Sequence, residues 1–295
     1  MAPETAPVSS VSDLIHLLRT DGYLADRGLA TAAYVALTLG KPLLLEGEVG
    51  VGKTELAKAM ASVLGRELIR LQCYEGIDTN QALYEWDYAR QMLQIRALSQ
   101  AELATDDSVD KLFGPKFLLE RPLLAAIRRG DRAVLLVDEI DRADDEFEAF
   151  LLELLSDFQI TIPELGTISA DAPPLVILTS NRTRELHDAL KRRCLYHWVG
   201  YPDPEREVEI VMTRTPGTTE TLARKIVEMV NRLRSLDLDK PPGVAETLDW
   251  VETMAVLEVD DPDRESIRET LGAVVKDHDD METVLGALDR IAVDG

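Results

Sequence analysis

Five short apolar runs alternate with amphipathic stretches along the first part of the chain. Each run is bounded by Gly, Pro or charged residues, which is typical of strands buried on both faces of a sheet. The runs span residues 41–47, 67–73, 132–139, 172–181 and 194–201. The helices predicted between them span residues 53–64, 121–131 and 144–158. This alternation predicts an α/β fold with an open parallel five-stranded sheet flanked by helices.

Three other segments accompany this sheet pattern. Residues 11–40 have a helical pattern with a break near Asp21. Residues 74–114 are longer than a simple connection, and we interpret them as an insertion that carries at least one helix. Residues 159–169 alternate in polarity, which predicts a small β-hairpin.

The pattern changes at Pro202, beyond which the apolar spacing is helical throughout. Helices are predicted over residues 204–214, 219–235, 243–257 and 263–291. We therefore expect a small helical lid domain after the sheet. The predicted organisation is a partly disordered N-terminal lead at 1–19, a nucleotide-binding α/β domain at 20–201 and a lid with acidic C-terminal helices at 202–295.

The charge and amino-acid composition of the chain argue against nucleic-acid and membrane partners. The 295-residue chain has a formal net charge of −22, which repels phosphate backbones, so no nucleic-acid partner is expected. No run of about 18 apolar residues is present, and no membrane partner is expected. The two cysteines, Cys73 and Cys194, are far apart and form no CxxC pair, which favours reduced thiols and a cytoplasmic location over a disulfide framework or a zinc site.

The stretch GEVGVGKT follows the first apolar run and precedes a predicted helix, and it matches the phosphate-loop pattern GxxxxGK[ST]. The glycines let backbone N–H groups wrap a phosphate at a helix N-terminus, which favours negative charge. Lys53 is expected to reach the β- and γ-phosphates, and the Thr54 hydroxyl is placed to bind Mg²⁺. The predicted nucleotide-binding residues are Gly47, Glu48, Val49, Gly50, Val51, Gly52, Lys53, Thr54 and Asp138.

Polar residues end two of the later strands. VLLVDE ends in Asp138, expected to hold Mg²⁺ through water, and Glu139, expected to polarise the attacking water. VILTSN ends in Asn181, whose amide is expected to orient that water or sense the γ-phosphate. The predicted catalytic residues are therefore Glu139 and Asn181, with Thr54 and Asp138 as metal ligands.

In this order, these motifs resemble an AAA+ ATPase, and within that class the chain resembles the MoxR family. The matching blocks are LLLEGEVGVGKTELAKAMA, LLVDEIDRADDEFEAFLLELLSDFQITIPELG and VILTSN. The segments LQCYEGIDTNQALYEWDY, ALKRRCLYHW and KPPGVAETLDW resemble the subgroup associated with maturation of molybdenum-containing carbon monoxide dehydrogenase. The resemblance covers roughly residues 20–255, and it identifies the hairpin at 159–169 with that clade's hairpin before the Asn strand.

The resemblance explains why so acidic a chain gathers Lys191, Arg192 and Arg193 just before its last strand. In AAA+ rings an arginine at this position reaches the γ-phosphate held by the neighbouring subunit, where it stabilises the transition state. Arg193 matches the family position better, and Arg192 is the alternative. The resemblance also implies a hexamer of identical chains, ATP and Mg²⁺, a partner with a von Willebrand factor A domain, and a client enzyme.

The resemblance is incomplete at the lid. Many relatives carry an arginine at the start of a lid helix, whereas this chain has Ala245, Glu246 and Thr247 in the matching stretch. Gln72 stands where relatives couple partner binding to the catalytic Glu, with a strand-end Gln as the alternative interpretation. Tyr23 and Leu24 are candidates for the adenine pocket.

Our leading hypothesis is a ring-forming ATPase that remodels or matures another protein. A DNA-associated, replication-type AAA+ ATPase is an alternative, against which the acidity argues. A nucleotide-binding scaffold without turnover is a second alternative, against which the intact motif residues argue. A small-molecule kinase has the least support, because no segment resembles an acceptor-substrate lid.

Overall fold

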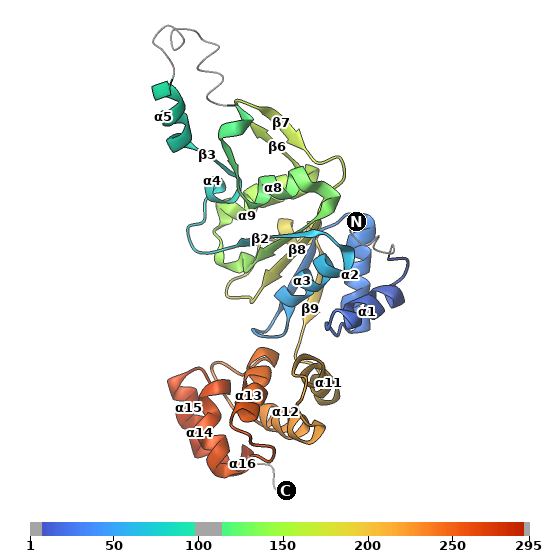
Figure 1. Cartoon of the computed structure of the whole chain (residues 1–295), viewed down its shortest axis with the longest axis vertical. Helices are drawn as coiled ribbons and strands as arrows, with labels where there is room; N and C mark the ends of the chain where they lie inside the picture. Colours follow the sequence, from blue (N-terminus) through green and yellow to red (C-terminus); the bar gives the residue numbers. More distant parts are fainter. Residues whose placement is uncertain (1–7, 98–113, 292–295) are drawn as a thin grey trace. The chain divides into compact units, whose positions relative to one another are not determined.

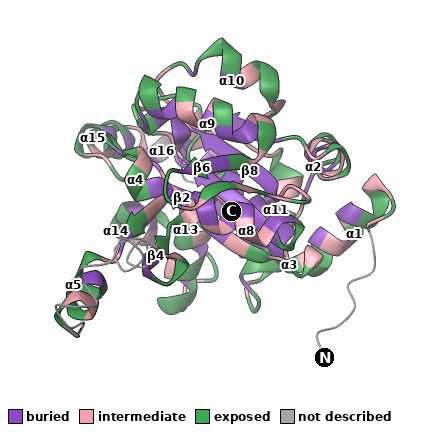
Figure 2. Cartoon of the chain, turned by 90° about the horizontal axis from the view of Figure 1, so that it is seen from above, coloured by how far each residue is buried: buried purple, intermediate pink, exposed green. Residues whose placement is uncertain are grey.

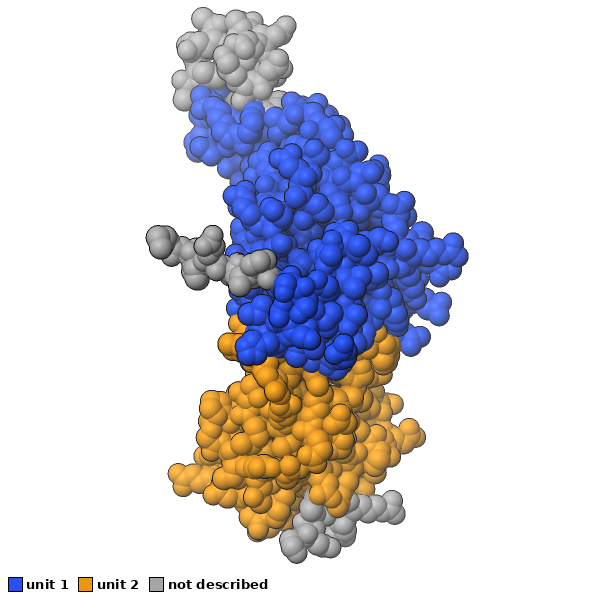
Figure 3. Space-filling model, turned by 90° about the vertical axis from the view of Figure 1, so that its right-hand side faces the viewer, with its two compact units in different colours: residues 1–17, 25–46, 56–197 blue, residues 18–24, 47–55, 198–295 orange. Residues whose placement is uncertain are grey.

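The computed structural model describes residues 8–97 and 114–291, and its contacts divide the chain into two compact units (Figure 3). The first comprises residues 1–17, 25–46 and 56–197, and the second comprises residues 18–24, 47–55 and 198–295. The phosphate loop thus groups with the C-terminal helices. The domain boundaries expected from the sequence, at residues 1–19, 20–201 and 202–295, remain a prediction, because this division by contacts does not test them. Part of the predicted N-terminal lead, residues 1–7, lies outside the described residues.

The first unit is built on a five-stranded sheet in the order β2-β5-β8-β1-β9 (Figure 1). Its strands are β1 (Leu43–Gly47), β2 (Glu67–Gln72), β5 (Ala133–Asp138), β8 (Leu175–Ser180) and β9 (Leu195–Val199). The pairings of β2 with β5, β5 with β8 and β8 with β1 are parallel. The predicted fold class, a parallel five-stranded sheet flanked by helices, is confirmed.

Burial along the strands follows their order in the sheet. Every residue of the inner strands β1, β5 and β8 is buried, whereas β2 and β9 at the edges mix buried and exposed residues. Figure 2 shows buried residues in β8 and in α8. Inner strands are covered on both faces, which is why they appear in the sequence as uninterrupted apolar runs.

Helices precede and separate these strands, as the apolar periodicity predicts. They are α1 (Val11–Thr20), α2 (Arg27–Leu39), α3 (Lys53–Leu64), α8 (Pro122–Arg129), α9 (Asp145–Asp157) and α10 (Asp188–Arg193). Short 3₁₀ turns flank β5, namely η2 (Gly130–Arg132) and η3 (Ile140–Arg142). α8 packs against β2 and β5 and buries Leu123, Leu124 and Ile127.

Two small antiparallel pairs extend this unit. The hairpin predicted at 159–169 is confirmed as β6 (Gln159–Ile162) and β7 (Gly166–Ser169). The predicted insertion at 74–114 contains the expected helix, α5 (Tyr88–Ala97), and two elements that were not expected, α4 (Thr79–Ala82) and β3 (Tyr84–Trp86). Directly after it come η1 (Pro115–Phe117) and β4 (Leu118–Glu120), and β4 pairs with β3. Residues 98–113 of the predicted insertion lie outside the described residues.

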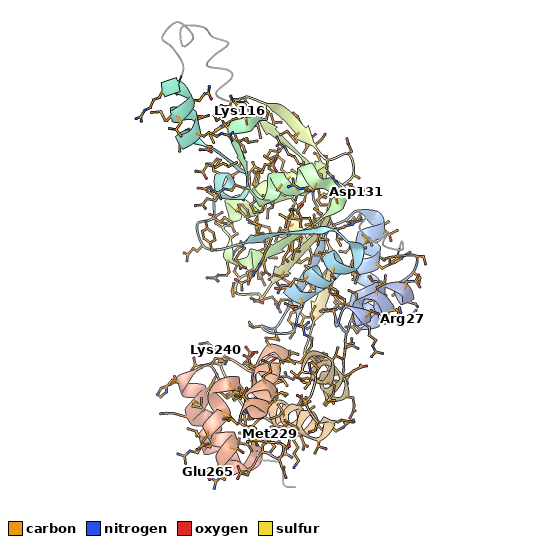
Figure 4. All side chains as sticks on the ribbon, viewed as in Figure 1. Arg27, Lys116, Asp131, Met229, Lys240 and Glu265 are labelled. Atoms are coloured by element: carbon orange, nitrogen blue, oxygen red, sulfur yellow. The ribbon has the colours of Figure 1, made fainter. Side chains whose placement is uncertain are left out.

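The second unit is a helical bundle around its own apolar core. Its helices are α11 (Pro204–Arg214), α12 (Glu220–Arg234), α13 (Val244–Val256), α14 (Arg264–Val274), α15 (His278–Gly286) and α16 (Leu288–Ile291). Met229 of α12, labelled in Figure 4, is buried in this core together with Trp250 and Ile267. Trp250 Nε1 donates a hydrogen bond to Thr270 Oγ1 at 2.9 Å, which satisfies the indole inside the bundle.

The helix expected over 263–291 is wrong as a single element, because the chain breaks between α14 and α15. Val275 is extended and buried, and Asp277 then begins α15 by accepting a hydrogen bond from the Asp279 N–H at 3.0 Å. Asp280 is 3% exposed, and its carboxylate accepts the N–H groups of Asp239 and Lys240 at 2.8 and 2.9 Å. This tie to the loop before α13 fixes the new helix direction.

Candidate active site

The phosphate loop, residues 47–54, connects β1 to α3 and is shaped by glycine. Gly50 and Gly52 have φ values of 75° and 90°, a left-handed conformation that other residues rarely adopt. A Cβ on Gly47 would lie 2.0 Å from the Val199 carbonyl oxygen, so only glycine fits there. The glycines that the sequence pattern singles out are therefore required by the backbone itself.

Lys53 begins α3, and its side chain is 6% exposed. Its Nζ donates hydrogen bonds to the carbonyl oxygens of Gly47 at 2.8 Å and Glu48 at 2.6 Å. The ammonium is thus held against the loop, at the helix N-terminus where backbone N–H groups favour an anion. Thr54 follows in the first turn of α3. A glycine cradle with a held ammonium and an adjacent hydroxyl fits a nucleotide phosphate and a hard cation.

Asp138 ends β5 and is 3% exposed. Its Oδ1 accepts a hydrogen bond from Thr179 Oγ1 at 2.6 Å, and its Oδ2 accepts from Arg70 Nε at 3.0 Å and Nη2 at 2.5 Å. The partners come from β8 and β2, which flank β5 in the sheet. Sequence reasoning missed Arg70, because its pairing depends on the strand order.

Glu139 directly follows β5 in a left-handed conformation with φ 55° and ψ 51°. Its N–H donates to Thr179 Oγ1 at 2.9 Å, and its carboxylate Oε2 accepts from Gln72 Nε2 at 2.9 Å and from Arg142 Nη1 at 3.1 Å. The side chain is 32% exposed. The carboxylate is therefore oriented by neighbouring residues and still reaches solvent, which suits a group that must polarise water.

Asn181 directly follows β8, whose neighbour is β5. The N–H groups of Asn181 and Thr183 donate to Asp141 Oδ2 at 3.2 and 2.8 Å, and Thr183 Oγ1 donates to the same oxygen at 2.7 Å. Asp141 is 2% exposed, so it ties the segment after β8 to the segment after β5. We did not predict this role for Asp141, although a second aspartate so soon after Asp138 in VDEID was a visible signal.

Cys73 lies beside these carboxylates, and its N–H donates to the Asp138 carbonyl oxygen at 2.9 Å. Burial, and then the negative charges of Asp138, Asp141 and Glu139, raises the pKa of its thiol to about 12. Burial alone raises the pKa of the Cys194 thiol to about 12. Neither thiol is a nucleophile at neutral pH, because the thiolate is the reactive form.

The arginines before β9 are the last residues of α10, and both are exposed. Arg193 Nη1 donates to Ser156 Oγ on α9, within the same chain. Whether Arg192 or Arg193 reaches a neighbouring subunit stays a prediction.

The two adenine-pocket candidates contact different parts of the second unit. Tyr23 OH donates to the Gly52 carbonyl oxygen at 3.3 Å, and the Leu24 carbonyl oxygen accepts from Arg206 Nη2 at 2.7 Å. Tyr23 therefore contacts the phosphate loop, and Leu24 contacts α11.

The start of α13 carries Ala245, Glu246 and Thr247 and no arginine. Glu246 Oε2 instead accepts the Gly243 N–H at 2.9 Å, which caps the helix.

The chain has a phosphate loop after β1, the acidic pair Asp138 and Glu139 at the end of β5, and Asn181 at the end of β8, which lies between β5 and β1. This combination defines a P-loop nucleotide-binding protein. Within that class, the model of the AAA domain family (dynein-related subfamily) matches residues 42–194, more than half of the chain. The chain belongs to this family.

The chain is also similar in sequence to several curated proteins. An uncharacterized protein of Staphylococcus saprophyticus is 21% identical over 276 residues, which cover 90% of this chain and 95% of that protein. Protein NorQ of Paracoccus denitrificans is 26% identical over 202 residues, covering 66% of this chain and 65% of NorQ. Chaperone protein ClpB 2 of a Nostoc species is 32% identical over 174 residues, covering 59% of this chain and 16% of ClpB.

Among solved structures, the P216G mutant of RuvB from Thermotoga maritima resembles this chain with a TM-score of 0.50 and 17% sequence identity. The match covers 97% of this chain and 81% of that one, and it supports the fold of an α/β unit followed by helices. In the part of the chain that the structure describes, no helix is both long and apolar enough to cross a membrane.

Proposed function

We propose that this chain is a Mg²⁺-dependent ATPase that works as a ring and remodels or matures a partner protein. The observation that carries the proposal is the pair ending β5, with Asp138 buried and held on both oxygens and Glu139 oriented but reachable by water. A scaffold without turnover would have no need of an oriented, solvent-reaching carboxylate at this place.

Each site residue has a separate role in this proposal. The loop N–H groups and Lys53 bind the β- and γ-phosphates. Glu139 accepts a hydrogen bond from the attacking water and so orients it. Asn181 positions that water or contacts the γ-phosphate. Mg²⁺, when bound, neutralises charge on the phosphate oxygens. Thr54 is its proposed direct ligand, and Asp138 acts through water, since its two oxygens already accept hydrogen bonds from the protein.

Assembly into a hexamer is part of the proposal. The exposed arginines at the end of α10 would lie against the nucleotide of a neighbouring copy, with Arg193 as the residue that stabilises the transition state. Both are on a short helix directly before the edge strand β9, so they are presented at the margin of the sheet.

The chaperone-like part of the proposal is supported by similarity to a protein named as a chaperone, ClpB 2, and by the MoxR resemblance of the sequence blocks. That resemblance suggests a von Willebrand factor A domain partner and a molybdenum-containing carbon monoxide dehydrogenase-type client. A cytoplasmic location and the absence of a nucleic-acid partner stay predictions.

The primary test is ATP binding and phosphate release by the purified chain, with and without Mg²⁺. Binding with Mg²⁺-dependent release is expected, and a chain that binds no ATP would refute the proposal. Client identity is tested by isolating the proteins held by the Glu139→Gln variant in ATP. Tight binding of duplex DNA near physiological salt in a gel-shift assay would favour a DNA-associated ATPase instead.

A further inference from the structure

The start of α13 contacts the phosphate loop directly through backbone atoms. The N–H groups of Val244 and Ala245 donate to the Gly50 carbonyl oxygen at 3.1 and 3.2 Å. These are N–H groups from the first turn of a helix, which have no partner inside the helix itself. All of these residues belong to the second compact unit.

The approach of the two segments requires glycine on both sides. A Cβ on Gly243 would lie 2.5 Å from the Val49 carbonyl oxygen and 2.8 Å from Gly50 Cα. A Cβ on Gly50 would lie 2.8 Å from Glu246 Oε2 and 3.1 Å from Gly243 Cα. Gly243 has φ −85° and is extended, so its backbone alone would accept any residue. Space against the loop, rather than backbone conformation, therefore excludes a side chain at Gly243.

This contact sets the direction of a phosphate-binding donor. All peptide bonds of the described chain are trans, and a trans peptide points its C=O and N–H in opposite directions. Since the Gly50 carbonyl points at α13, the Val51 N–H of the same peptide points away from α13. Hydrogen bonds to the carbonyl also polarise that N–H and make it a better donor.

A buried polar network holds the start of α13 in place. Arg234 donates to Glu207 at 2.6 and 2.8 Å and to the Pro242 carbonyl oxygen at 2.8 Å, and its guanidinium lies 4.3 Å from the centre of the Tyr201 ring. Thr247 Oγ1 donates to Glu207 Oε1 at 2.7 Å. Glu207 is fully buried, so α11, α12 and α13 are tied together at one carboxylate, next to Gly243.

We propose that the N-terminus of α13 positions the Gly50–Val51 peptide for phosphate binding, and that Gly243 is the positioning residue that allows it. The start of α13 has no arginine to contact a nucleotide. Its backbone contact with Gly50 instead links the phosphate loop to the helical bundle. Phosphate binding at the loop and packing of α13 then stabilise each other, since coupling between two sites is reciprocal. The inference rests on the proposed nucleotide-binding function.

The test compares Gly243→Ala with Gly272→Ala, the same one-methyl change at a helical position with no atom within 4 Å of the added Cβ. Gly243→Ala should weaken ATP and ADP binding about tenfold in a nucleotide titration and raise KM more than it lowers kcat. Gly272→Ala should bind like the parent. Equal affinity of Gly243→Ala and the parent would overturn the inference while leaving the proposed function intact.

Hydrogen exchange on the unmodified chain gives a second measurement that does not depend on a variant folding. The Val244 and Ala245 amides should exchange more slowly when ADP is added, because bound phosphate and the α13 contact hold the same peptide. Unchanged exchange at these amides, in a chain that titration shows to bind ADP, would overturn the inference. A chain that binds no ADP or ATP would instead refute the proposed function.

Discussion

Gln72 Nε2 donates a hydrogen bond to Glu139 Oε2 at 2.9 Å, and this contact joins the end of β2 to the residue that follows β5. Parallel pairing places Gln72 directly beside Asp138, so the amide reaches the next carboxylate along the chain. A carboxylate that accepts from an amide and a guanidinium is restrained in orientation. Gln72 is therefore in direct contact with the proposed catalytic group.

We expect Gln72→Met to lower ATP hydrolysis. A hydrogen bond to a charged group is worth about 1.5–3 kcal/mol, so loss of this restraint on the orientation of Glu139 should lower kcat by about tenfold. KM for ATP should change little, since no nucleotide contact is removed. Steady-state phosphate release measures both constants.

Gln159→Met, the same substitution at an exposed position of β6, is the control and should leave the rate unchanged. A Gln72→Met variant that hydrolyses ATP as fast as the parent or faster would show instead that the amide does not hold Glu139 in its active orientation.

Glu139→Gln and Lys53→Ala should separate turnover from binding. Glu139→Gln removes the negative charge that polarises water but leaves Lys53 and Thr54 in place, so ATP affinity should persist while kcat falls by about 100-fold or more. Lys53→Ala removes an ammonium held on the loop, so affinity itself should fall. Nucleotide titration and phosphate release on both variants check this. Parental turnover by the Gln variant would contradict the role of Glu139.

The two cysteines should be inert to thiol reagents in the folded chain. Burial raises the pKa of both the Cys73 and the Cys194 thiol to about 12, well above the ordinary pKa of a cysteine thiol, so thiolate is nearly absent at pH 8. Because the folded-state pKa is raised, the associated stability is fully present below pH 9 and is lost as pH rises toward 12. The rate of reaction with a thiol-specific dye, with and without denaturant, measures the reactivity of the two thiols. Rapid labelling of the native chain at pH 8 would contradict the prediction that they are inert.

The sheet was predictable because its inner strands are covered on both faces and so appear as unbroken apolar runs. The phosphate loop and the acidic pair were also visible, since each depends on neighbouring residues in a fixed spacing. Partners from distant strands were not: Arg70 reaches Asp138 only because β2 lies beside β5. The break after Val274 was missed because the apolar pattern continues through it, while a buried Asp280 sets the new direction.

The buried polar network of Glu207, Arg234 and Thr247 could not be predicted from the sequence for the same reason. Arg234 and Glu207 are charged residues on amphipathic helices, where the sequence pattern predicts solvent exposure. Their burial follows from the packing of α11 on α12, and only the structure shows that they pair.

Arg234→Met should destabilise the chain strongly. It leaves the fully buried Glu207 carboxylate with a hydroxyl donor only, and breaking a buried pair costs about 3–5 kcal/mol. Urea unfolding measures the loss. Arg224→Met breaks exposed pairs with Glu205 and Glu220 and is the control, with an unfolding midpoint close to that of the parent. Equal midpoints for the two variants would contradict a stabilising role for the buried pair.

Activity should belong to the assembled ring if Arg193 acts on a neighbouring copy. Hydrolysis per chain should then rise with protein concentration as chains associate. Arg193→Ala should bind ATP normally and hydrolyse it about 10³-fold more slowly, since an arginine supplied in trans stabilises charge in the transition state. Arg192→Ala, which removes an equally exposed positive charge from the same helix end, is the control.

Mixing two inactive variants tests the trans arrangement most directly. Arg193→Ala keeps an intact phosphate loop, and Lys53→Ala keeps an intact arginine, so each homogeneous ring should be nearly inactive. A ring assembled from both contains interfaces where a sound loop faces a sound arginine, and partial activity should return. Mixed rings that form but stay inactive, or an Arg192→Ala variant that is the inactive one, would exclude Arg193 as the trans residue. Full activity of dilute monomers would refute the trans mechanism itself, because no neighbouring copy is then available.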